Sequence, residues 1–128
     1  MSLLKSIFGS SEKQSTIVNK INWIPLITIE QLDDIVIESK DNLVIIFKHS
    51  TRCSVSRMVL KEFENDYNLE NKALPYFLDL LEHRDISNEI ASRFSIIHQS
   101  PQLIIIKNGI SVYNASHSDI DATIVLNY

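Results

Sequence analysis

The chain has 128 residues, of which 45% are hydrophobic and 22% are charged. This size and composition predict one soluble globular domain with a single core, and they argue against intrinsic disorder. The net charge of −4 and the lack of a basic block give no indication of a nucleic-acid partner. No apolar run approaches the roughly 18 residues of a membrane-spanning helix. One cysteine cannot form an intramolecular disulfide, so the sequence predicts a reducing, cytoplasmic location.

The first element with a clear pattern lies beyond residue 15. Residues 1–15 are expected to form a flexible tail, and residues 16–128 the folded domain. Pro25 cannot continue a helix and favours an extended segment, with Trp23 packed on the core or on the edge of the domain.

A helix is predicted from Ile29 to about Ser39, because apolar residues recur there on one face. Thr28 and Gln31 have the spacing of a capping box, which marks the helix start. The turn Lys40–Asn42 then leads into the next element.

The stretch from Leu43 to Phe63 carries the chemistry. Leu43–Phe47 is a run of five apolar residues, typical of a strand covered on both faces. We interpret Lys48–Arg52 as a polar elbow, followed by the only cysteine, Cys53, and by a helix from about Val55 to Asn65.

This arrangement places the sulfur of Cys53 at or just before the first turn of a helix. Backbone N–H groups are unpaired there and the helix dipole favours negative charge, so the reactive thiolate is stabilised. Neighbouring side chains add possible cations and hydroxyl donors: Lys48, His49, Arg52, Ser54 and Ser56. The alternative is a cysteine that acts only as a small buried hydrophobic residue.

The middle of the chain continues the alternation of strands and helices. Ala73–Leu81 is predicted to be a strand. Asp85 is predicted to cap a third helix, in which Ile86, Ile90 and Phe94 recur every four residues.

The last third predicts a hairpin and a short helix. Gln102–Ile106 is an apolar strand, and Asn108-Gly109 is the strongest short hairpin signal before a partner strand at Ile110–Tyr113. A loop at 114–118 and a helix from about Asp119 to Leu126 complete the chain.

This order of elements predicts an α/β protein with a mixed β-sheet flanked by helices. In such sheets functional groups gather at the carboxyl ends of the strands, where Cys53 falls. The four histidines and the cysteine show no metal-ligand spacing, so no metal and no bound cofactor are expected. His98 and His117 lie in loops that could reach this end of the sheet, and a structural or solvent role is favoured for each.

A strand that leads to Cys-x-x-Ser at a helix start, with a later Ser-Pro before a strand and hairpin, resembles the thioredoxin-like fold. Within that fold the chain resembles the monothiol bacilliredoxins. The residues that carry this resemblance are Phe47–Cys53, Ser56, Ser100–Gln102, Asn108-Gly109 and Ala115–His117, together with Trp23. The family often has proline directly after the cysteine, whereas this chain has Ser54, a difference that bears on the reactivity of the cysteine.

The resemblance implies roles for individual residues. Cys53 would be the nucleophile, and Ser56 stands where dithiol relatives keep a resolving cysteine. Pro101 would be the cis-proline that faces the active cysteine, and Ser100 would offer its backbone to a bound peptide or thiol. From their places beside Cys53, Arg52, Ser54 and Ser56 are also predicted to contact the small thiol or the substrate. Without the resemblance, a trans bond before Pro101 is the more common alternative.

The function that follows is removal of a low-molecular-weight thiol from protein mixed disulfides by Cys53. Bacillithiol would be the co-substrate and S-thiolated client proteins the partners, with no nucleic acid and no membrane span involved. One alternative is a thioredoxin-fold binding or sensor module without turnover. Another is a monothiol glutaredoxin with an iron–sulfur cluster, which is weaker because Ser54-Val55 replaces the Gly-Phe of its Cys-Gly-Phe-Ser motif.

Overall fold

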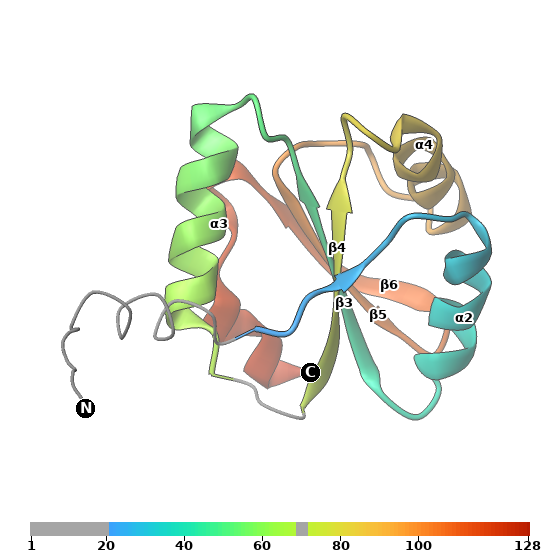
Figure 1. The fold of residues 1–128 in the computed structure, drawn as a ribbon. Coiled ribbons are helices and arrows are strands. Elements are labelled where there is room, and N and C mark those ends of the chain that lie inside the picture. Colours follow the sequence, from blue (N-terminus) through green and yellow to red (C-terminus); the bar gives the residue numbers. More distant parts are fainter. Residues whose placement is uncertain (1–20, 69–71) are drawn as a thin grey trace, which may run out of the picture.

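The structure is a computed structural model that describes residues 21–68 and 72–128 (Figure 1). The predicted tail and the first residues of the predicted domain therefore lie outside the described residues. Within the described part, the strands are β2 (Ile24–Pro25), β3 (Leu43–His49), β4 (Ala73–Asp79), β5 (Gln102–Lys107) and β6 (Ile110–Ser116). The helices are α2 (Glu30–Glu38), α3 (Ser54–Asp66), α4 (Arg84–Arg93) and the 3-10 helices η1 (His117–Asp119) and η2 (Ala122–Asn127).

The described strands form one mixed sheet in the order β2-β4-β3-β5-β6. β2, β4 and β3 run parallel, whereas β5 and β6 pair antiparallel. Helices α2 and α4 lie on one face of the sheet, and α3 lies on the other with the C-terminal segment (Figure 1). The predicted α/β architecture, a mixed sheet flanked by helices, is confirmed.

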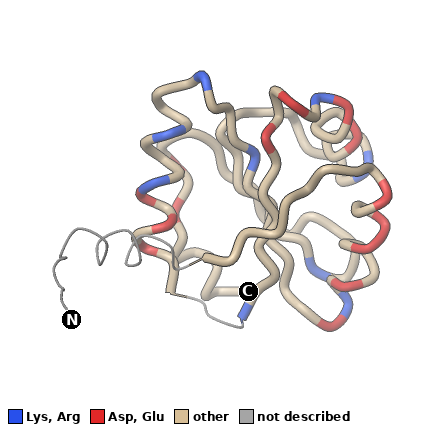
Figure 2. The backbone as a smooth tube through the Cα atoms, in the orientation of Figure 1, with Lys and Arg blue, Asp and Glu red and all other residues tan. Residues whose placement is uncertain are grey.

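The central strand β3 is buried along its whole length. Its alternate residues enter different cores: Val44 and Ile46 pack under α2 and α4, whereas Ile45 and Phe47 pack under α3. A strand covered on both faces needs apolar residues at consecutive positions, which explains its continuous apolar run. Charged residues gather instead on the helices and turns, and the strands are mostly uncharged (Figure 2).

The predicted polar elbow is wrong for its first two residues. Lys48 and His49 belong to β3, because β4 pairs with both of them and β5 pairs with Lys48. The turn to α3 is therefore shorter and begins at Ser50.

Trp23 closes the α3 face of the core beside β2. Its ring lies 5.9 Å from that of Phe47 and 6.0 Å from that of Phe63. The indole Nε1–H donates to a carboxylate oxygen of Glu64 at 2.8 Å. Stacking and the hydrogen bond together hold the chain against α3 where it enters the sheet.

The outer strand β2 covers only part of its neighbour. It pairs with Tyr76 and Phe77 of β4, and the N–H of Leu26 donates to the carbonyl oxygen of Phe77 at 2.9 Å. Pro75 precedes this contact and stands opposite Ile45 of β3. Backbone polar groups alternate in direction along a strand, so the nitrogen of Pro75 faces the outer side, as does the carbonyl of Phe77.

The helix starts agree only partly with the sequence. The capping box is confirmed, because the N–H of Gln31 lies 3.3 Å from Thr28 Oγ1 and Gln31 Oε1 accepts from the N–H of Thr28 at 2.9 Å. The prediction that Asp85 caps α4 is wrong. His83 occupies the cap position, and Asp85 lies in the first turn, where a carboxylate still complements the helix dipole.

The C-terminal third differs from the prediction in two places. The Asn108-Gly109 hairpin is confirmed, and both residues have positive φ, 54° and 79°. β6 continues through Asn114 to Ser116, because β5 pairs with it as far as Gln102. The predicted last helix is instead two 3-10 helices, and Asp121 begins the second by accepting from the N–H of Thr123 at 2.9 Å.

Candidate active site around Cys53

Cys53 lies at the N-cap of α3, where the turn from β3 ends. Its N–H donates to the carbonyl oxygen of Ser50 at 3.2 Å, and its own carbonyl accepts from the N–H of Arg57 at 3.1 Å. The residue is half-buried and extended, with φ −100° and ψ 121°. The first turn of the helix contains no acidic residue. A thiolate at this position would face unpaired backbone N–H groups without a neighbouring carboxylate on the same turn.

Ser56 lies one turn further along and is fully buried. Its hydroxyl accepts from the N–H of Ser50 at 3.1 Å and is hydrogen-bonded to His49 Nδ1 at 2.7 Å. Burial lowers the pKa of His49, whereas Asp79 opposes that shift. The described contacts of Ser56 are therefore with the protein itself, and its contact with substrate remains a prediction.

The Ser100–Pro101 bond is cis, as the resemblance implies. Since Gln102 pairs with Lys48, the antiparallel start of β5 lies beside the end of β3 that leads to Cys53. The carbonyl of Pro101 accepts from the N–H of His117 at 3.0 Å. The pairing of β3 with β5 thus brings Pro101 to the same end of the sheet as Cys53.

A hollow of about 370 Å³ lies directly beside this turn. It is lined by Thr51, Arg52, Asp79, Leu81 and Glu82, from the carboxyl ends of β3 and β4. Arg52 supplies a cation at the rim and two acidic residues supply carboxylates. The acidic residues were missed in the sequence, although Asp79 ends the strand that pairs with β3 and stands opposite His49.

Ser54 and Arg52 are exposed on either side of Cys53. Both can be reached by a molecule that approaches the thiol from solvent. Their contact with a small thiol remains a prediction.

The sequence suggested that Lys48 lies in the turn before Cys53 and supports a thiolate electrostatically. In the structure Lys48 lies instead at the end of β3, away from the surface of that turn. It follows Val44 and Ile46 on the face toward α4 and is fully buried. Its Nζ lies 2.7 Å from His98 Nδ1, and the hydroxyl of Ser87 lies 3.1 Å from the same nitrogen. Burial lowers the pKa of Lys48 to about 8. The period-2 alternation of β3 could have placed Lys48 on this face, but nothing in the sequence indicates its partner.

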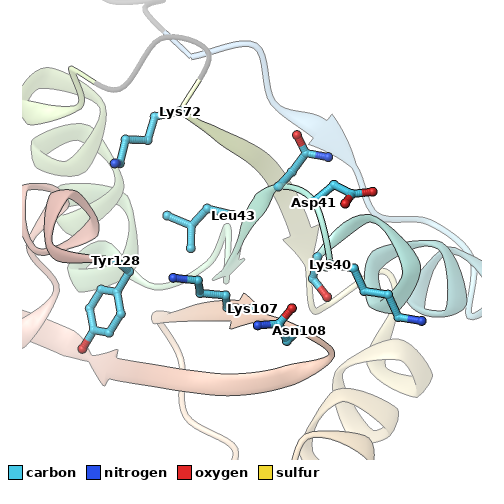
Figure 3. A pocket seen from close by; sticks show the side chains of 9 residues that line it. Lys40, Asp41, Leu43, Lys72, Lys107, Asn108 and Tyr128 are labelled. Carbon is cyan, nitrogen blue, oxygen red and sulfur yellow. The ribbon is translucent and has the colours of Figure 1, made fainter.

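A second hollow, of about 230 Å³, lies at the opposite end of the sheet (Figure 3). Its lining includes Leu43, Lys72, Lys107 and Tyr128 and none of the residues predicted for the site. The predicted residues therefore gather at one end only, where β3 leads into α3.

In the described ranges 21–68 and 72–128, no group of three His, Cys, Asp or Glu side chains is placed to hold a metal ion. No helix there is long and apolar enough to cross a membrane.

The strand order, a lone cysteine at the start of α3 and a cis-proline before β5 define a thioredoxin-fold protein with a single-cysteine site. Solved structures agree with this fold. One, described as having a thioredoxin fold, matches with a TM-score of 0.70 at 30% identity, over 81% of this chain and 90% of its own. The thioredoxin of Malassezia sympodialis matches with a TM-score of 0.62 at 21% identity, over 80% and 84%. The oxidised thioredoxin of Plasmodium falciparum matches with 0.63 at 17%, over 84% and 98%.

The family described as "Monothiol bacilliredoxin BrxC" matches residues 24–125. The chain belongs to the monothiol bacilliredoxin family. This membership supports a thiol redox role for the protein, and Cys53 is its only thiol.

Proposed function

We propose that this protein removes a low-molecular-weight thiol, bacillithiol, from client proteins that carry it as a mixed disulfide. The observation that carries the proposal is the half-buried Cys53 at the N-cap of α3, with the buried Ser56 where a resolving thiol would stand. Membership of the bacilliredoxin family supports bacillithiol as the small thiol.

The reaction proceeds by two thiol–disulfide exchanges. The thiolate of Cys53 attacks the small thiol's sulfur in the mixed disulfide, so that a new S–S bond forms and the bond to the client breaks. The client leaves as a thiolate and takes a proton. A second molecule of the small thiol, as its thiolate, attacks the same sulfur, releases Cys53 and forms the disulfide of two small thiols.

Resolution must come from outside the chain, because the sequence holds one cysteine. The hydroxyl of Ser56 cannot form a disulfide and is engaged by His49 and Ser50. The protein would therefore work with the small thiol as its reductant, in the cytoplasm, where such thiols are kept reduced.

The hollow beside the turn that precedes Cys53 suits a small thiol that carries both signs of charge. Arg52 at its rim would bind a carboxylate of the thiol, whereas Asp79 and Glu82 would favour ammonium or hydroxyl groups. A thiol held there would lie next to the turn from which the sulfur of Cys53 attacks.

The test is the intact mass of reduced protein after exposure to oxidised bacillithiol and, separately, to oxidised glutathione. We expect a rapid bacillithiol adduct that free bacillithiol reverses, and no adduct on Cys53→Ser. Arg52→Gln should slow adduct formation, whereas Lys61→Gln, a matched exposed cation on α3, should not. No adduct with either thiol would overturn the proposal and leave a thioredoxin-fold binding module.

A further inference from the structure

A polar cluster, buried except for its exposed member His98, lies on the far side of β3 from α3. It consists of Lys48 on β3, Ser87 on α4, Gln102 on β5 and His98 in the loop between α4 and β5. Lys48, Ser87 and Gln102 are at most 1% exposed. A buried lysine is rare unless it is paired, and here the described partner of its amine is His98 Nδ1 at 2.7 Å.

The side chain of Gln102 binds backbone groups of the same loop. Its Nε2 donates to the carbonyl oxygen of Ile97 at 3.0 Å, and its Oε1 accepts from the N–H of Gln99 at 3.3 Å. Side chains from two central strands thus hold the loop at three consecutive residues, 97 to 99. The next two residues are Ser100 and the cis-proline Pro101.

The hydroxyl of Ser100 indicates why this loop is held in place. It is the only buried side-chain polar atom without a hydrogen-bond partner in the described ranges. Such a group is costly unless water or a ligand supplies the missing bond, so the hydroxyl is free to bind a substrate. It directly precedes Pro101, at the end of the sheet that carries Cys53.

We infer that Lys48 and His98 are positioning residues, which hold the loop before Pro101 in the arrangement that receives the substrate. This inference rests on the proposed function, because it concerns binding of the thiolated client or small thiol at that loop. Neither residue would take part in the exchange of sulfur bonds.

The charges around His98 make this contact depend on its protonation state. An ammonium group has only donors, so Nδ1 of His98 must accept from Lys48 and the ring must be neutral. The charged groups that act on His98 are Lys48 from β3 and Arg84 from α4, both cations. Ser87 and Gln102, the other side chains of the cluster, are uncharged. Burial and these two cations lower the pKa of His98, and protonation would leave Lys48 without an acceptor.

The decisive variant is His98→Asn. The asparagine Oδ1 can take the place of Nδ1 as acceptor for Lys48, but it does not titrate. His98→Leu removes the acceptor at every pH. His83→Asn, which removes a histidine at the cap of α4 outside the cluster, is the matched control.

The first readout is KM and kcat for removal of bacillithiol from a thiolated peptide between about pH 8 and pH 5. For the wild type and His83→Asn we expect KM to rise about tenfold toward the acidic end, the loss expected for one charge-assisted hydrogen bond. KM of His98→Asn should stay low throughout, and KM of His98→Leu should be high throughout. Alkylation of Cys53 by iodoacetamide should be equal in all four proteins.

The second readout does not need turnover. The protection factor of the Gln99 amide, which Gln102 binds, is its intrinsic hydrogen-exchange rate divided by the observed rate; it should fall at low pH in the wild type and stay constant in His98→Asn. If no protein turns over, the proposed function fails, and this exchange still decides the inference. The inference would be overturned if neither KM nor the protection of the Gln99 amide changed with pH in the wild type. It would also be overturned if His98→Asn behaved like His98→Leu.

Discussion

Replacement of Lys48 by methionine tests whether the buried charge in β3 destabilises the fold. The side chain is fully buried, and burial lowers its pKa from 10.5 to about 8. Burial therefore disfavours the charged amine in the folded state. This penalty is absent above pH 10.5, where the amine is neutral in both states, and it grows as the pH falls until it is complete below about pH 8. A shift of this size corresponds to about 3 kcal/mol against the charged form at neutral pH.

Methionine has a similar length and no charge, so Lys48→Met should raise the free energy of unfolding by about 1–2 kcal/mol at pH 7. That gain is smaller than the full penalty because the hydrogen bond to His98 is lost, although Ser87 still contacts Nδ1. The gain should shrink by about 2 kcal/mol between pH 7 and about pH 9.5, as the wild-type amine becomes neutral.

The measurement is urea unfolding of both proteins across this pH range. Taking the difference between variant and wild type removes the titration of groups that both share, such as Tyr67 and Tyr76, whose pKa values burial raises. Lys107→Met, at the exposed end of β5, is the matched control for the loss of a lysine. A difference for Lys48→Met that is constant from pH 7 to 9.5 would refute the reasoning.

Two further substitutions test the site and the hairpin. Ser56→Cys places a second thiol where dithiol relatives keep their resolving cysteine. After a small-thiol adduct forms on Cys53, we expect intact mass to show release of the small thiol and formation of an intramolecular disulfide. A persistent adduct would show that the two sulfurs cannot meet. Gly109→Ala introduces a Cβ at φ +79°, 3.4 Å from Val36 Cγ1, and should lower the free energy of unfolding by about 1 kcal/mol in urea titration. Asn42→Ala, in an exposed turn, is its control, and equal effects would contradict the argument.

Elements whose sequence pattern lies within a few consecutive residues were predicted correctly. The capping box at Thr28, the apolar run of β3 and the Asn108-Gly109 turn each depend on residues a few positions apart, and each was confirmed. The position of Cys53 at the start of α3 follows from the same kind of signal.

The errors arose where distant residues decide the structure. Lys48 and His49 are polar and suggested a turn, yet β4 extends the sheet along both of them. Their burial is compensated by His98, fifty positions away, and by Ser56 on the next helix. Polarity alone cannot reveal such partners.

Local sequence patterns predicted those residues of the candidate site that are neighbours in the chain, but not those that come from distant segments. Arg52, Cys53 and Ser54 are neighbours, so one turn holds them together. Pro101 reaches the same end only through the antiparallel register of β3 and β5, which the resemblance implied and composition did not. The carboxylates of the hollow come from the end of β4, and a strand end alone carries no sign that a cavity follows.

The position of Pro75 bears on how readily the outer edge of β4 could pair with another chain. Among residues 21–68 and 72–128, β4 is paired on its outer side for only two residues, and the rest of that side presents hydrogen-bonding groups onto which a strand from another molecule could add. Proline has no N–H, and the nitrogen of Pro75 faces that side, so the row lacks a donor just before the pairing with β2 begins. The proline removes no backbone hydrogen bond between β4 and β3, yet it makes this edge of the sheet a poor template for aggregation.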